Sequence, residues 1–172
     1  MSIKISDDYL AGFIDGEGSF YIGVVPSEEA KLGWQVIHFF KVSQNPSGKV
    51  ILDFLKKKIQ GGYVRPNHKA SNDDKSLAYV VRDFDTLYNK VIPFLVDTID
   101  IKQKELIKFK KVLELVKAGR HLNINGMKEI LDISYSMNTK KRKYHKEFII
   151  QDMKSRIPTD YTPDTAVHQV LL

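Results

Sequence analysis

Residues 9–20 read YLAGFIDGEGSF, a short apolar segment that is interrupted by glycines and ends in two acids. Apolar side chains recur in it at helical spacing, which predicts a helix, and we expect Asp7 or Asp8 to cap its start. Gly12 and Gly16 share one face of that helix, where a second backbone can approach closely. The segment therefore predicts a helix that packs on another helix and delivers carboxylates to a fixed point.

The composition limits the classes of protein to which the chain can belong. The chain has 172 residues, 42% of them hydrophobic, which suffices for one globular domain with a real core. No apolar run approaches about 18 residues and no signal-peptide pattern occurs, so we expect no membrane association. The absence of cysteine excludes disulfides, thiolate metal sites and cysteine nucleophiles. We expect one domain over residues 1–157, followed by a tail over residues 158–172.

Charge is unevenly distributed along the chain. The net charge is +6, but residues 1–30 carry one lysine and six acids, which is −5, so the remaining 142 residues carry +11. A basic body suits DNA or RNA, because phosphate neutralisation supplies most non-specific affinity, although a merely soluble basic protein fits as well. Two acids within such a body would repel phosphate unless a divalent cation lay between them. This conflict indicates metal-dependent phosphodiester chemistry.

The rest of the chain alternates between strand and helix patterns. Strands are predicted at Ser19–Val25, Trp34–Gln44, Tyr63–Asn67 and Ala78–Arg82. Helices are predicted at Lys49–Ile59, at Phe84–Val96 with a break or kink at Pro93, and at Ile101–Lys117, with weaker ones at Asn125–Tyr135 and Tyr144–Arg156. The order αββαββα predicts an α+β fold with a four-stranded antiparallel sheet, one helix-covered face and additional C-terminal helices.

The other face of this sheet is predicted to be open. An open four-stranded sheet can lie in a DNA major groove, where Gln and Asn suit adenine and Arg and Lys suit guanine. A solvated face, or one covered by a partner protein, fits the same pattern. The candidate reading face takes alternate side chains from all the strands, namely Tyr21, Gly23, Val25, Gln35, Ile37, Lys41, Arg65, Asn67, Val80 and Arg82.

Residues 10–18, LAGFIDGEG, resemble the signature motif of the LAGLIDADG homing endonucleases. The αββαββα order extends this resemblance over residues 8–118, and shorter segments resemble members with a single motif that group I introns encode. One copy of the motif without an internal repeat implies a homodimer, and a symmetric dimer implies a roughly palindromic DNA site. The resemblance places the dimer interface at Leu10, Ala11, Gly12, Asp15 and Gly16.

The resemblance also implies which residues bind metal. The second acid of the family motif is the metal ligand, which is Glu17 here, and the neighbouring Gly16 would contribute its backbone carbonyl. Glu17 from each subunit would meet at the dimer axis and hold Mg²⁺, a cation that prefers oxygen ligands. The metal ions would activate water and stabilise the leaving 3′ oxygen. Asp15 is expected to support the helix end or the interface.

Two further catalytic positions follow from the resemblance. Gln44 falls where the family has a polar residue that orients the attacking water, and Lys102 falls where it has a lysine near the scissile phosphate. Without the resemblance, a turn glutamine and a solvated helix lysine explain these positions as well. Relatives carry a basic residue shortly after the glutamine, whereas this chain has PSGK at 46–49, so Lys49 is the candidate substitute.

The sequence therefore predicts a site-specific, Mg²⁺-dependent DNA endonuclease that acts as a homodimer on double-stranded DNA and leaves short 3′ overhangs. An RNA maturase on the same fold and a DNA-binding module without catalysis are the alternatives. The presence of Glu17 favours the nuclease over the maturase.

Other patterns are weaker. The histidines show no metal-ligand spacing, and no Walker A, GxGxxG or Ser/His/Asp pattern indicates a small-molecule substrate. The basic run KKRK at 140–143 is either a phosphate contact or a solvated segment. The missing targeting signal fits synthesis from an intron inside a chloroplast or mitochondrion, and equally a prokaryotic cytoplasm.

Overall fold

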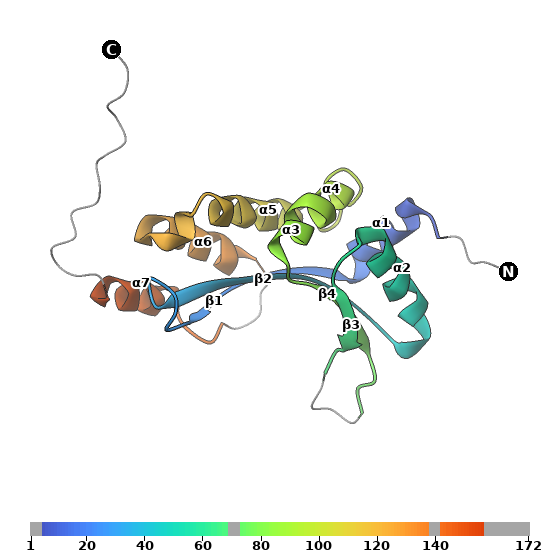
Figure 1. The fold of residues 1–172 in the computed structure, drawn as a ribbon, viewed down its shortest axis with the longest axis horizontal. Helices are drawn as coiled ribbons and strands as arrows, with labels where there is room; N and C mark the ends of the chain where they lie inside the picture. Colours follow the sequence, from blue (N-terminus) through green and yellow to red (C-terminus); the bar gives the residue numbers. More distant parts are fainter. Residues whose placement is uncertain (1–4, 69–72, 138–141, 157–172) are drawn as a thin grey trace, which may run out of the picture.

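A four-stranded antiparallel sheet forms the base of the fold, with helices over one face (Figure 1). The computed structural model describes residues 5–68, 73–137 and 142–156. The strand order is β1-β2-β4-β3, with bounds β1 (Gly18–Pro26), β2 (Trp34–Gln44), β3 (Tyr63–Pro66) and β4 (Leu77–Val81). The helices are α1 (Asp7–Glu17), α2 (Lys49–Ile59), α3 (Phe84–Thr86), α4 (Ile92–Leu95), α5 (Gln103–Lys117), α6 (Ile124–Ser136) and α7 (Lys146–Ser155). This order confirms the predicted αββαββα core and the additional C-terminal helices.

The register of the sheet separates a core face from an outer face. Phe20 of β1 lies opposite Phe40 of β2, and Tyr21 lies opposite Phe39. Because successive side chains of a strand point to opposite faces, Phe20 and Phe40 enter the core while Tyr21 and Phe39 occupy the outer face. The helix-covered face is the one that carries Phe20, as the alternation predicted.

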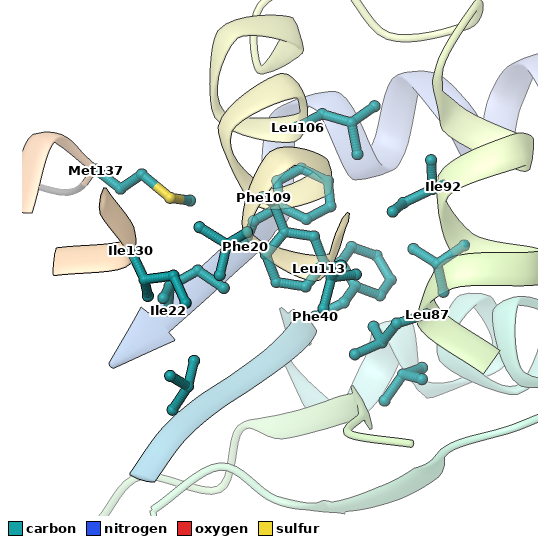
Figure 2. Close-up of a cluster of buried hydrophobic side chains, with 14 of the residues drawn as sticks. Phe20, Ile22, Phe40, Leu87, Ile92, Leu106, Phe109, Leu113, Ile130 and Met137 are labelled. Atoms are coloured by element: carbon teal, nitrogen blue, oxygen red, sulfur yellow. The ribbon is translucent and has the colours of Figure 1, made fainter. Parts of the chain in front are cut away.

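The core face joins α5 to the two longest strands (Figure 2). The ring centroid of Phe20 lies 5.3 Å from that of Phe109 and 5.4 Å from that of Phe40, and all three side chains are buried. Truncating one such ring to alanine typically costs about 3–5 kcal/mol, because the transfer energy is lost and a cavity remains. This packing fixes α5 relative to the start of β1, which follows directly on Glu17.

The cap of α1 differs from the prediction. The hydroxyl of Ser6 accepts the backbone N–H of Tyr9 at 3.1 Å, so Ser6 is the N-cap and not Asp7 or Asp8. Ser6 is extended, as a capping residue must be, whereas Asp7 is already helical. Asp7 instead forms an ion pair with Lys58 of α2, which ties the two helices together.

At Pro93, where the sequence predicts a break or kink, the structure instead has a widened helical turn. The helical stretch continues from α3 through a π-helical turn, η2 (Leu87–Val91), into α4. The backbone N–H of Ile92 bonds the carbonyl of Leu87, five residues back, immediately before the proline that cannot donate. A widened turn therefore accommodates Pro93 within a continuous stretch.

The C-terminal helices are confirmed within one or two residues of their predicted bounds. Asn123 caps α6 by accepting the N–H of Gly126 at 2.8 Å. Two short 3₁₀ turns connect the helices and strands, η1 (Pro46–Gly48) and η3 (Arg120–Leu122). None of the described helices is long and apolar enough to cross a membrane. The predicted tail, residues 158–172, lies outside the described residues.

Candidate active site

The C-terminal end of α1 presents Glu17 at a sharp junction. Glu17 is the last helical residue, Gly18 begins β1, and both Gly16 and Glu17 are exposed. A Cβ atom on Gly18 would lie 2.5 Å from the carbonyl oxygen of Ile14, so a side chain does not fit there. The helix therefore turns into the strand within one residue, and the strand leaves the Glu17 carboxylate at a fixed place.

Asp15 anchors the segment that precedes α5. Its carboxylate accepts the backbone N–H groups of Asp100, Ile101 and Lys102 at 3.1, 2.9 and 2.8 Å. Burial alone would raise the pKa of Asp15, but the three N–H donors and the Lys102 ammonium hold the pKa below its ordinary value. The helix that follows, α5, begins at Gln103 and not at the predicted Ile101.

Lys102 turns its side chain back onto the end of α1. Its Nζ donates to the carbonyl of Gly16 at 2.7 Å and to the carbonyl of Asp15. The unpaired carbonyls at a helix C-terminus carry partial negative charge, which favours an ammonium group at this position. The structure thus brings together Lys102 and Gly16, two residues that the resemblance assigned to catalysis and to metal binding, beside Glu17.

The oxygen donors at this point fit Mg²⁺. One chain offers the Glu17 carboxylate and the Gly16 carbonyl, and the described residues contain no cluster of three or more acidic, histidine or cysteine side chains. Mg²⁺ keeps several waters and is usually held by one or two carboxylates together with substrate phosphates. The donor set is therefore suited to a metal that is shared with a phosphate and a second carboxylate.

Gln44 and Lys49 are engaged locally in this structure. The Gln44 Oε1 accepts the N–H of Asn45 at 2.7 Å, and its side chain lies over Gly48, where a Cβ would be 2.2 Å from Gln44 Cγ. The Lys49 Nζ pairs with Asp53 at 2.6 Å on the exposed surface of α2. Both side chains would have to leave these partners to act at Glu17.

The predicted reading residues share the outer face. The register pairs Gly23 with Ile37, Val25 with Gln35 and Lys41 with Val80, which places alternate residues of neighbouring strands side by side. Arg65 pairs with Ala78 on the same face, and Asn67 and Arg82 follow the ends of β3 and β4.

Two of these residues are not accessible. Val80 is only 1% exposed, because it lies on an interior strand between Lys41 and Tyr63, whose larger side chains flank it. Gly23 is buried, and a Cβ there would lie 2.8 Å from the Tyr21 ring. Both residues thus lie on the predicted face of the sheet, but they expose little surface in the free protein.

Asn67 is already held by a network across the outer face. The Lys41 Nζ donates to its Oδ1 at 3.3 Å, and its Nδ2 donates to the Ser76 hydroxyl at 3.2 Å. The two ends of the amide therefore link β2 to the segment between β3 and β4. Bidentate contact with adenine uses both ends of an amide, so such contact requires Asn67 to exchange these partners.

Phe39 and Arg142 extend the outer face beyond the predicted set. The Phe39 ring stacks on Tyr21 with centroids 4.7 Å apart, the Arg82 guanidinium lies 5.3 Å from the Phe39 centroid, and Arg142 lies 5.5 Å from the Tyr21 centroid. Each of the two stacked rings thus has a guanidinium beside it. Strand alternation signals Phe39, which lies between Ile37 and Lys41 on the same face.

The Arg142 side chain stabilises the fold through hydrogen bonds to three backbone carbonyls. Its guanidinium donates to the carbonyl of Ile22 on the edge strand β1 at 2.9 Å, and to the carbonyls of Ser134 and Met137. These bonds tie the chain after α6 to the free edge of β1. The described part of the predicted basic run therefore secures the fold, and residues 140 and 141 lie outside the described residues.

The sequence matches the family described as LAGLIDADG endonuclease over residues 10–116, which include the α1 motif, the sheet and α5. The chain belongs to this family. It is 28% identical over 137 residues to the probable intron-encoded endonuclease 2 of Neurospora crassa, a match that covers 78% of this chain and 29% of that protein. The chain spans less than two thirds of the length of the curated relatives that it matches.

Solved structures agree with this LAGLIDADG assignment. The homing endonuclease I-TnaI superposes with a TM-score of 0.75 at 29% identity, covering 90% of this chain and 100% of that chain. The archaeal intron-encoded homing endonuclease I-Vdi141I, solved in complex with DNA, gives a TM-score of 0.77 at 25% identity, covering 87% and 95%. The predicted family and fold are thereby confirmed.

Proposed function

We propose that the chain is a site-specific DNA endonuclease that acts as a homodimer and hydrolyses phosphodiester bonds with Mg²⁺. The observation that carries this proposal is the Asp15 anchor, which brings the Lys102 ammonium onto the Gly16 carbonyl beside Glu17. An ammonium, a carbonyl and a carboxylate at one exposed point suit a phosphate and a divalent cation. The description of I-Vdi141I as a homing endonuclease complexed with DNA supports the same substrate class.

The proposed dimer seam is the exposed face of α1. Gly12 and Gly16 are exposed, and apart from the adjoining helix backbone no atom of the described residues lies within 4 Å of a Cβ built on either glycine. Tyr9, at 52% exposed, stacks on Phe13 along the same face. Pairing two such faces about a two-fold axis would bring the backbones close together and the two Glu17 carboxylates to the axis.

Fewer α1 residues than the sequence predicts are available for this dimer interface. Leu10 and Ala11 are each 2% exposed and Asp15 is 9% exposed, so these residues are buried within their own chain and offer little surface to a partner. Ile101 is 79% exposed, and Asp15 fixes its backbone next to α1. An exposed apolar side chain next to α1 suits contact with the second copy of the chain in the dimer.

Each residue has a separate part in the proposed hydrolysis. Glu17 and the Gly16 carbonyl would hold Mg²⁺ once the Lys102 ammonium leaves that carbonyl for the phosphate, and the bound metal would activate water and stabilise the leaving 3′ oxygen. Lys102 places positive charge where the phosphate develops negative charge. Gln44 orients the attacking water once its Oε1 leaves the Asn45 N–H. Cutting on both strands would leave short 3′ overhangs.

The outer face of the sheet is the proposed DNA surface. Its accessible members offer rings, amides and cations that suit base edges and phosphates in a major groove. A symmetric dimer would present two such faces to a roughly palindromic site. The proposed contacts are Tyr21, Val25, Gln35, Ile37, Lys41, Arg65, Asn67 and Arg82.

An RNA maturase on the same fold is the second candidate. The exposed Glu17 beside Lys102 favours the nuclease, because RNA binding alone needs no carboxylate at a phosphate site. The intron-encoded relative from Neurospora crassa supports synthesis from an intron, which would place the protein in an organelle. The archaeal structure supports a prokaryotic cytoplasm as the alternative.

The test is cleavage of DNA that carries candidate insertion sites, including the joined flanks of the reading frame. We expect Mg²⁺-dependent double-strand cutting by the wild type, and binding without cutting by Glu17→Gln. Glu147→Gln, which changes an exposed glutamate on α7, should cut normally. Intact duplex at every site contradicts the proposal, and selective binding of intron RNA would support the maturase instead.

A further inference from the structure

Helix α7 is attached to the far end of the β1–β2 hairpin through one carboxylate. Asp152 Oδ2 accepts the indole N–H of Trp34 at 2.7 Å and the Nε–H of Arg156 at 2.8 Å. Trp34 is the first residue of β2, and 118 positions separate it from Asp152. The helix thus holds the strand at the point where the hairpin turns.

Arg156 extends this attachment to the backbone of the turn. Gly33 has a φ of +73°, and a Cβ there would lie 2.6 Å from Nε and Cζ of Arg156, so the side chain rests directly on the glycine. Gly33 closes the turn by donating to the carbonyl of Ala30 at 2.7 Å and accepting from Ser27 at 2.9 Å. Arg156 therefore covers the residue that shapes the hairpin tip, residues 27–33.

Aromatic packing fixes the direction of Trp34. The indole is 4% exposed and meets the rings of Tyr144 and Phe148 edge-on, at centroid distances of 5.2 and 6.3 Å. The next residue, Gln35, points to the outer face, because successive side chains of a strand alternate. Because Gln35 follows Trp34 directly in the strand, the contacts that hold Trp34 on the core side also fix the position of Gln35 on the outer face.

The hairpin tip lies far from the candidate catalytic point. Eight residue steps separate Gly18, which follows Glu17, from Pro26, and at about 3.4 Å per step they span about 27 Å. DNA rises about 3.4 Å per base pair, so a strand that follows the groove reaches at most about eight base pairs outward. Figure 1 shows α7 beside this end of the sheet, away from α1.

We propose that Asp152, together with Arg156, is a positioning residue for recognition of the outer base pairs of each half-site. By holding Trp34 and Gly33, α7 fixes the hairpin tip and Gln35 before DNA binds, so less ordering remains at binding. The inference rests on the proposed DNA endonuclease and deepens it. It assigns the C-terminal helix a part in specificity that is separate from catalysis.

Cleavage profiles test this assignment. Wild type, Asp152→Ala and Asp132→Ala are compared on targets that carry one substitution at each half-site position. We expect Asp152→Ala to bind the matched target more weakly and to lose about tenfold discrimination at the outer positions, while it keeps discrimination at the inner ones. Asp132→Ala removes another ion pair of α7, the 2.6 Å contact with Lys146, and should keep the wild-type profile.

Hydrogen exchange provides a measurement that does not depend on cutting. Residues 26–34 should exchange faster in Asp152→Ala than in wild type, while α5 keeps its protection. Arg156→Ala, which removes an exposed side chain, serves if Asp152→Ala does not fold. Unchanged exchange at the tip, or a loss that is equal at all DNA positions, overturns the inference. A wild type that cuts no DNA but shows the exchange difference refutes the proposed function and leaves the attachment of the hairpin intact.

Discussion

Replacing Asp15 with asparagine tests the anchor on which the candidate site is built. The carboxylate serves three backbone N–H groups with two oxygens, one accepting from Asp100 and Ile101 and the other from Lys102. Asparagine offers a single oxygen, so in its better orientation the amide group faces the N–H of Lys102. That donor then has no acceptor in a site that is 9% exposed.

The expected loss follows from these bonds. A hydrogen bond to a charged acceptor contributes about 1.5–3 kcal/mol, and a neutral acceptor about 1 kcal/mol less, so one lost and two weakened bonds amount to about 3–5 kcal/mol. For a chain of this length, this loss in the free energy of unfolding lowers Tm by about 6–20 °C. In the Asp15→Asn variant, Lys102 should no longer be held in its position beside α1, and the cleavage rate should fall as a result.

Thermal unfolding at several pH values gives the measurement. The pKa of Asp15 in the folded chain lies below its ordinary value of 3.8, so the stabilisation is complete above that pH and is lost as the pH falls through the folded pKa. The gap in Tm between wild type and Asp15→Asn should therefore be constant near neutrality and shrink in acid below about pH 3.8. The control Asp132→Asn alters an exposed ion pair and should melt like the wild type. Equal Tm values for wild type and Asp15→Asn at pH 7, or a gap that does not shrink in acid, would refute the anchor.

Three further substitutions test separate parts of the structure. Gln44→Ala removes the side chain that is proposed to orient the attacking water, so it should slow cleavage about 100-fold without weakening DNA binding; an unchanged rate contradicts the role of Gln44. A Cβ at Gly12 meets no described atom within 4 Å outside the adjoining helix backbone, so Gly12→Arg should leave the fold intact while sedimentation shows monomers; an intact dimer excludes the α1 seam. Arg142→Lys cannot satisfy three carbonyls in the same geometry, so chemical denaturation should show a loss of about 1–3 kcal/mol, and full stability would show that the edge of β1 needs no such tie.

Local pattern predicted most of the fold. The bounds of β2 and α2 agree with the prediction to the residue, because turn residues at 45–48 and glycines at 61 and 62 mark their ends. Alternation also placed Lys41 and Arg65 on the same face. These features depend on neighbours in the chain, which the sequence displays directly.

Long-range contacts account for what the sequence did not predict. The anchoring of the segment before α5 depends on Asp15, 87 positions before Lys102, whose N–H it accepts, and has no local signal. The attachment of Trp34 to Asp152 joins segments 118 positions apart and has no local signal. Likewise, the burial of Val80 depends on the side chains of adjacent strands, so periodicity gave its face and not its depth.

The central claim is that two copies of Glu17 act together at the α1 seam. Co-expression of wild-type and Glu17→Gln chains in equal amounts should pair them at random, so about a quarter of the dimers carry two intact glutamates. Double-strand cutting per dimer, measured on the matched target under excess DNA, should then fall to about a quarter of the wild-type value. The mixed dimers, about half of the total, should leave the duplex intact; singly nicked duplex from these dimers would mean that each chain cuts its own strand independently, and would contradict the shared site.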